Sequence, residues 1–172
     1  MVKLMRRKLP YLLLFAVTMG YFEASVVVYL RALFYPEGFA FPLQPVVPPH
    51  VDETLITLVE LGREAASILM ILAVAWLSGT GFQPVSAGYN PAPPSKNAVR
   101  WERFACVCFI FGVWDIVYYI ALKLTLGWPA SLADWDVLFL MPLPWVGPVW
   151  GAQVSAAVAL PDTMRLPLAL ML

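Results

Sequence analysis

The sequence predicts an all-α fold: an integral membrane four-helix bundle whose fourth helix is kinked or broken by prolines. Hydrophobic residues make up 61% of the 172 residues and charged residues 13%, against about 25% charged residues in typical soluble domains. Four apolar segments, at about 9–34, 55–77, 104–126 and 137–160, are each long enough to cross a bilayer, which takes roughly 20 helical residues. The whole chain, 1–172, is therefore expected to form a single transmembrane domain.

The first segment follows a basic stretch, Lys3 to Lys8, an order that also occurs in signal peptides. Its apolar run continues well past the roughly 15 residues of a signal-peptide core, and no clear small-residue cleavage site follows. We therefore interpret 9–34 as a retained first helix.

The loops differ in charge, and this difference predicts how the helices are oriented. The basic residues of the N-terminal tail, the second loop and the C-terminal tail are Lys3, Arg6, Arg7, Lys8, Lys96, Arg100, Arg103 and Arg165. The acidic residues of the other two loops are Glu37, Asp52, Glu53, Asp134 and Asp136. By the positive-inside rule both termini are expected to be cytoplasmic, together with the flexible, Gly- and Pro-rich loop 78–99.

Polar side chains inside the first three segments form the candidate site, a binding site for a ligand or a proton. Those in the first two segments are Glu23, Arg31, Glu60, Arg63 and Glu64, and those in the third are Asp115, Tyr118, Tyr119 and Lys123. Spacings of three and four residues put Glu60, Arg63 and Glu64 on one helix face, and the same rule groups Asp115 with both tyrosines. The set converges on the outer half of the predicted membrane.

The energetics of insertion favour an inward orientation for these charges. A charge at the centre of a membrane helix costs roughly 2.5–3.5 kcal/mol, whereas each Leu, Ile, Phe or Val returns only about 0.3–0.6 kcal/mol. One lipid-facing charge therefore cancels about six apolar residues. We expect the acids and bases to face each other inside the bundle, with Ser25 or Ser67 as further hydrogen-bonding partners.

The fourth segment contains three prolines within seven positions, Pro142, Pro144 and Pro148. One proline kinks a helix, and three so close together are expected to break it. A broken helix beside a charged cluster is how several transporters form a mid-membrane site. A kinked helix or a short re-entrant turn is the alternative.

The buried charges leave two functions open. They are either a site for a proton, an ion or a small polar ligand, or an ion-pair network that is purely structural in an accessory or assembly subunit of a larger membrane complex. Ionisable residues inside membrane segments favour the first interpretation, and the near balance of acids and bases favours the second. An enzyme is the weakest interpretation, because no nucleophile and base pair is recognisable.

Several cofactors and partners are not expected. The single histidine, His50, rules out a bis-histidine haem built from this chain alone, and Cys106 and Cys108 point in different directions on a helix. The acids alone would suit a hard cation, but the neighbouring bases disfavour it, so we expect neither a metal nor a cofactor. The expected partners are the lipid bilayer and either a second copy of the chain or other membrane subunits. No basic patch indicates nucleic-acid binding.

Four stretches resemble an uncharacterised family of small bacterial four-helix integral membrane proteins. They are FEASVVVYLRALFYPEGF, ELGREAAS, WDIVYYIALKLTLGWP and WDVLFLMPLPWVGP, and the resemblance covers most of the chain except the inner loop. It implies a bacterial cytoplasmic membrane, in agreement with the charge bias. It implies no activity, cofactor or catalytic residue.

Overall fold

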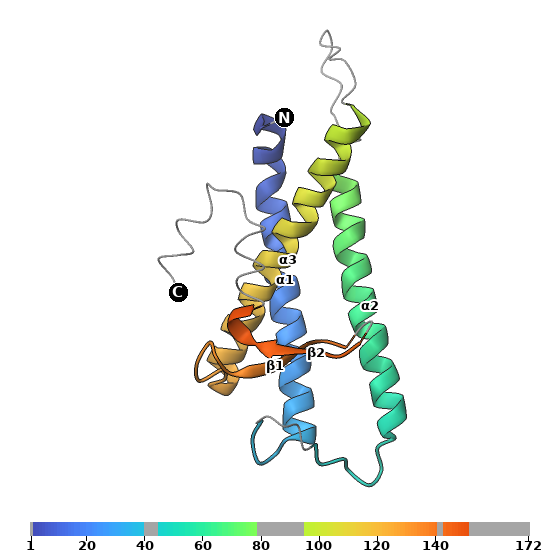
Figure 1. Ribbon diagram of the computed structural model, residues 1–172, viewed down its shortest axis with the longest axis vertical. Helices are drawn as coiled ribbons and strands as arrows, with labels where there is room; N and C mark the ends of the chain where they lie inside the picture. The colour runs from blue at the N-terminus through green and yellow to red at the C-terminus, as the bar shows by residue number, and fades with distance from the viewer. Residues whose placement is uncertain (1, 40–44, 79–94, 141–142, 152–172) are drawn as a thin grey trace.

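Figure 1 shows the computed structural model of the chain, which describes residues 2–39, 45–78, 95–140 and 143–151. The described residues form three long helices and a two-stranded sheet: α1 (Val2–Phe34), α2 (Glu53–Ser78), α3 (Lys96–Leu126), β1 (Trp135–Phe139) and β2 (Trp145–Pro148). The predicted mostly helical chain is confirmed, and the first three predicted segments lie within α1, α2 and α3. Most of loop 78–99, the second half of the predicted fourth helix and Arg165 lie outside the described residues.

Helices α1 and α3 pack closely because the α1 side of the contact is made of small residues. Ala16 and Ala24 are buried, and a Cβ added to Gly20 between them would lie 2.6 Å from the carbonyl oxygen of Trp114 on α3. Small residues four positions apart share one helix face and let two backbones approach. This contact fixes the position of Trp114 and of the next residue, Asp115, along the axis of α1.

Helix α2 turns one stripe of side chains towards the rest of the molecule. Its buried residues Glu64, Ser67, Ile71 and Ala75 recur every three or four positions, which is the period of one helix face. Ile71 and Ala75 join the apolar core formed with α1 and α3. The stripe therefore changes from apolar to polar along α2, and the polar part belongs to the candidate site.

Both ends of α3 have capping interactions. Ser95 accepts a hydrogen bond from the backbone N–H of Ala98 at 3.2 Å, and Gly127 ends the helix in the left-handed conformation with φ 69°. Lys123 donates from Nζ to the carbonyl oxygens of Gly127 at 3.3 Å and Pro129 at 2.6 Å. A lysine in the last turn commonly satisfies free carbonyls in this way.

Strands β1 and β2 form a β-hairpin, which corrects the first part of the helix predicted over 137–160. Strands β1 and β2 pair antiparallel, with Asp136 opposite Gly147 and Val137 opposite Val146. Pro144 and Pro148 have no N–H to donate to a helix, whereas edge strands tolerate proline. Among the described residues, Pro144 and Pro148 therefore belong to extended chain and not to a kinked helix, and residues 149–151 are helical again.

The hairpin crosses α1 and reaches towards α2 in the lower half of Figure 1. Its base is closed by backbone hydrogen bonds from Val149 to Asp134 and from Trp150 to Leu132, both 2.9 Å. The hairpin lies alongside the helices and not beyond their ends (Figure 1). Strand β1 therefore ends beside the polar part of α2, where Leu140 binds Glu64.

The described helices bury charges and expose large apolar side chains. Glu23 is 2% exposed and Arg31 6%, whereas Leu124 is 81% and Tyr11 76% exposed. Within the described residues, Lys8–Phe34 and Lys96–Leu126 are long and apolar enough to cross a membrane. Length and composition of this kind also occur in signal sequences and in core helices of soluble proteins.

Candidate functional site

The predicted site residues gather around a cavity of about 260 Å³. Its charged lining residues are Glu23, Arg31, Glu60, Arg63, Glu64, Asp115 and Asp136, and its aromatic ones are Tyr35, Phe39, Trp114, Tyr118, Tyr119 and Phe139. Eight of the nine residues chosen from the sequence are among them, the exception being Lys123. Helices α1, α2 and α3 and strand β1 all contribute, so the cavity exists only in the folded chain.

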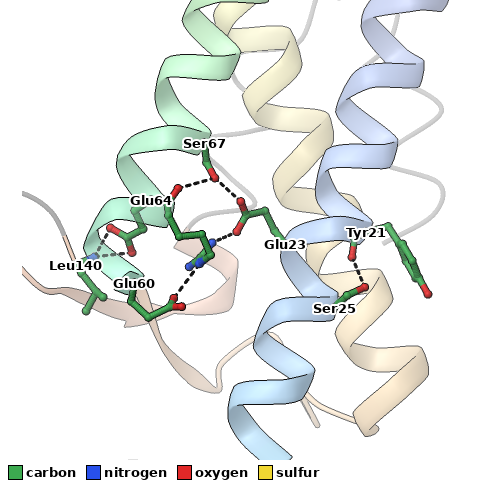
Figure 2. Close-up of polar contacts among 8 residues, drawn as sticks. Tyr21, Glu23, Ser25, Glu60, Glu64, Ser67 and Leu140 are labelled. Carbon is green, nitrogen blue, oxygen red and sulfur yellow. Dashed lines mark hydrogen bonds and ion pairs between the residues drawn. The ribbon is translucent and has the colours of Figure 1, made fainter. Parts of the chain in front are cut away.

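Arg63 is the centre of a network that joins α1 to α2, and Figure 2 labels its partners Glu23 and Glu60. It forms ion pairs with Glu23 of α1 and with Glu60 on its own helix, where Nε lies 2.8 Å from the Glu60 carboxylate. The hydroxyl of Ser67 donates to the same Glu23 carboxylate. Two groups of α2 therefore hold one buried acid of α1, as expected for charges that face each other.

Glu64 connects α2 to the end of β1. Both of its carboxylate oxygens accept from the backbone N–H of Leu140, at 2.9 and 3.0 Å (Figure 2). Leu140 directly follows β1, where the chain has left the ladder. Glu64 thus supplies a hydrogen-bond acceptor to a backbone group that the two-stranded sheet does not satisfy.

Arg31 is held by an acid and by two aromatic rings. Its Nη2 lies 3.4 Å from Oδ1 of Asp136, and its guanidinium carbon lies 3.7 Å from the ring centre of Phe39 and 3.8 Å from that of Trp128. Tyr119 donates from its hydroxyl to the other oxygen of Asp136 at 3.1 Å. Arginine suits such a place because its flat cation stacks on rings and is weakly hydrated.

Hydrogen-bonding capacity is left over around the cavity. Five buried side-chain atoms have no hydrogen-bond partner among the described residues: Arg31 Nε and Nη1, Trp114 Nε1, Asp115 Oδ2 and Arg103 Nε. Four of the five belong to residues that line the cavity. Buried polar groups are normally satisfied, and most of the unsatisfied buried side-chain atoms of the described residues belong to the lining of this cavity.

Two residues expected in the cluster have other partners. Lys123 is exposed and binds the carbonyls that follow α3, as described above, so it does not pair with Asp115. Ser25 donates to the Tyr21 carbonyl of its own helix at 2.8 Å (Figure 2). Both contacts are made within a few residues of the chain. The contact of Lys123 has a sequence signal, because Lys123 lies four residues before the glycine that ends α3.

Asp136, Trp114, Phe39 and Trp128 are among the residues that sequence reasoning missed. Asp136 was assigned to an outer loop because the next helix was expected to begin at 137, yet it is 4% exposed on β1. The proline-rich run that follows Asp136, flanked by β-branched and aromatic residues, is a hairpin signal that could have corrected this. Nothing in the sequence identifies Phe39 and Trp128 as the rings around Arg31.

The charge balance of the cavity is acidic. Its lining contains five carboxylate residues and two arginines, whereas the set predicted from the sequence has four acids and three bases. The inclusion of Asp136 and the removal of Lys123 therefore raise the acidic excess from one to three. Among the described residues, however, no three His, Cys, Asp or Glu side chains lie close enough together to hold a metal ion. The acids surround the cavity without converging on one point.

Comparison of the chain with protein-family models, curated proteins and solved structures finds no match. The resemblance to small bacterial four-helix membrane proteins therefore stays a prediction, and the function has to be argued from the cavity.

Proposed function

We propose that this protein is a multi-pass protein of a bacterial cytoplasmic membrane that binds a proton, an ion or a small polar ligand in the cavity between α1, α2, α3 and β1. The observation that carries the proposal is that eight polar residues chosen for being costly inside a membrane line one cavity in the fold. A membrane interior is the environment in which such residues are retained for function by default.

The distribution of side chains supports the membrane location. Soluble monomers rarely expose contiguous apolar patches beyond a few hundred square ångströms, whereas here exposed Tyr11, Leu14, Tyr21, Phe22 and Leu33 recur along most of α1. Large apolar side chains are likewise exposed along α2 and α3. Lipid tails would cover these side chains, while the charges stay inside the protein.

The hairpin supports a polar interior for the same reason. Backbone that is neither helical nor part of a closed barrel is tolerated at membrane depth only when it is buried in protein or lines a wet cavity. Residues 137–140 line the cavity, and Glu64 satisfies the N–H of Leu140. A cavity that accommodates strand backbone is suited to polar occupants.

Orientation follows from the charges at the two ends of the helices. Lys8, Lys96, Arg100 and Arg103 belong to the N-terminal parts of α1 and α3, whereas Glu37, Asp52 and Glu53 belong to the segment that joins the end of α1 to the start of α2. The N-terminal ends of α1 and α3 are uppermost in Figure 1, and the ends that this segment joins are lowermost. By the positive-inside rule the upper end faces the cytoplasm. The cavity then belongs to the outer half of the membrane.

The test compares two carboxylates of the cavity, Asp115 and Glu64, with one outside it, Glu102, using purified protein in mild detergent. We expect the thermal stability of the wild type to respond to pH between about 5 and 8, or to added sodium, methylammonium or acetate ions, because an occupant that binds the folded state stabilises it. Asp115→Asn and Glu64→Gln should remain folded and lose that response. Glu102→Gln should retain it, because Glu102 is a buried acid of α3 that pairs with Lys8 outside the cavity.

An unchanged response in both cavity variants would contradict the proposal. The competing function, an accessory or assembly subunit, is favoured by one observation: Glu23, Glu60 and Asp136 already have arginine partners. It predicts a heteromeric mass when the protein is released from its own membrane for native mass spectrometry. It also predicts that Asp115→Asn prevents folding, since its cluster would be purely structural.

A further inference from the structure

Two residues that line the cavity have polar atoms without a hydrogen-bond partner, and these atoms indicate the chemical class of an occupant. Trp114 is 9% exposed and its indole Nε1 has no partner among the described residues. On the neighbouring residue, Asp115, the buried Oδ2 also has none. Both residues line the cavity, so an occupant that satisfies these two atoms needs a donor and an acceptor of its own.

The net charge of the lining excludes an anion as the main occupant. Carboxylates outnumber arginines by three around the cavity, and like charges repel more strongly inside a protein than in bulk water. The free Nε and Nη1 of Arg31 do not reverse this, because Asp136 already lies 3.4 Å from the same guanidinium. A positively charged occupant reduces the excess, whereas an anion adds to it.

The positions of the acids and the aromatic rings indicate whether the cation is a metal ion or an organic one. A hard metal ion needs several oxygen ligands at 2.0–2.6 Å around one point, and the described residues contain no such group of acids. Aromatic rings make up much of the remaining wall, including Tyr118, Tyr119 and Phe139. Ring faces attract ammonium groups and pack against carbon, so the lining suits an organic cation.

We propose that the cavity binds a small organic amine whose ammonium group pairs with Asp115 and whose adjacent oxygen accepts a hydrogen bond from Nε1 of Trp114. The inference rests on the proposed function and specifies its ligand class. Ethanolamine is the simplest molecule with both groups in this relation. The same chemistry occurs as a free amino alcohol and as the headgroup of a phospholipid, and the experiment separates the two sources.

The experiment is isothermal titration calorimetry of ethanolamine into the full chain in nanodiscs of phosphatidylglycerol, a lipid without an amine. We expect saturable binding that Asp115→Asn weakens about tenfold or more, because a hydrogen bond to a charged group is lost. Trp114→Phe should weaken it about three- to tenfold, the range for a neutral hydrogen bond. Glu102→Gln is the matched control and should bind as the wild type does. Circular dichroism of each variant shows that it is folded.

A second titration, in nanodiscs that contain phosphatidylethanolamine, identifies the source. Loss of the ethanolamine signal there supports the headgroup as the occupant, and an unchanged signal supports the free amine. Acetate that binds more tightly than ethanolamine, or ethanolamine binding that is equal in Asp115→Asn and wild type, overturns the inference. If no amine binds while the pH or ion response of the preceding section persists and requires Asp115, the amine is wrong and the cavity function stands.

Discussion

Arg31 shows how a single residue joins separate parts of this molecule. It extends from α1, pairs with Asp136 on β1, and lies between the rings of Phe39 and Trp128 from two different loops. Arg31 and Asp136 are 6% and 4% exposed, so water screens the pair little. Desolvating both charges is costly, and it is tolerated here because stacking and the Tyr119 hydroxyl add to the attraction.

Arg31→Met and Asp136→Asn are each expected to lower the free energy of unfolding by about 3–5 kcal/mol, because each leaves one buried charge without its partner. The double variant should lose less than the sum, since neither charge is then stranded. Unfolding by sodium dodecyl sulfate in mixed micelles measures all three. Tyr119→Phe is the control for the hydrogen bond alone, with an expected loss of about 1.5–3 kcal/mol. Strictly additive losses would contradict the pairing.

The site residues that could be predicted are those whose charge is costly to place inside a membrane. Glu23, Glu64 and Asp115 are conspicuous in apolar segments, and all three line the cavity. Their partners were predictable only in part, because a partner is set by which helices pack together. Ser67 was expected as a hydrogen-bonding partner and donates to Glu23, whereas Lys123 was expected inside the cluster and the fold uses it to cap α3.

At the scale of the element, the contact between α1 and α3 determines the position of the site. Ala16, Gly20 and Ala24 form the small-residue face of α1, and Gly20 lies against the backbone of Trp114. A side chain at position 20 would push α1 and α3 apart next to Asp115, which follows Trp114 in the chain and lines the cavity. The packing of α1 on α3 and the geometry of the site are therefore coupled.

Gly20→Ala is expected to destabilise the protein even though alanine is the better helix former. The gain in helix propensity is about 1 kcal/mol, whereas overpacking costs about 1–3 kcal/mol, and the added Cβ would also lie 2.9 Å from Cβ of Val117. Gly62→Ala is the matched control, because nothing lies within 4 Å of its added Cβ. Thermal unfolding in detergent should show a lower midpoint for the first variant and an equal or higher one for the second. A higher midpoint for Gly20→Ala would show that the contact is looser than described.

The hairpin is the element that sequence reasoning assigned wrongly. The apolar content of 137–160 indicated a spanning helix, and the prolines indicated only its interruption. Composition does not distinguish a broken helix from an extended hairpin, because both contain proline and apolar residues. Cross-strand pairing, such as Val137 with Val146, decides between them.

For the whole molecule, the buried charges and exposed apolar faces together determine the expected environment. Basic residues such as Lys96 and Arg100 lie at one end of the helices and acids such as Glu37 at the other. Since the helices are antiparallel in sequence order (Figure 1), successive loops alternate between the two ends. In the proposed topology the loop after α1 therefore faces outward and the loop before α3 faces the cytoplasm.

Glu37→Cys is expected to react with a membrane-impermeant maleimide in intact bacterial cells, because the end of α1 that precedes it faces outward in this topology. Asn97→Cys, at the other end of the helices and equally exposed, should react only after the cells are permeabilised. Both are made with Cys106 and Cys108 replaced by alanine, and labelling is measured by gel shift. The reverse pattern would invert the topology, and labelling of both positions in intact cells would contradict a spanning protein.

The sequence by itself determined three long helices and eight of the polar residues that line the cavity, because helix period and the cost of burying charge are local properties. Only the tertiary structure decided that Asp136 is a site residue, that Lys123 is not, and that β1 and β2 form a hairpin. These outcomes depend on contacts between residues far apart in the chain, such as Arg31 with Asp136 and Glu64 with Leu140. Contacts of that kind form only when the elements pack, so no local pattern specifies them.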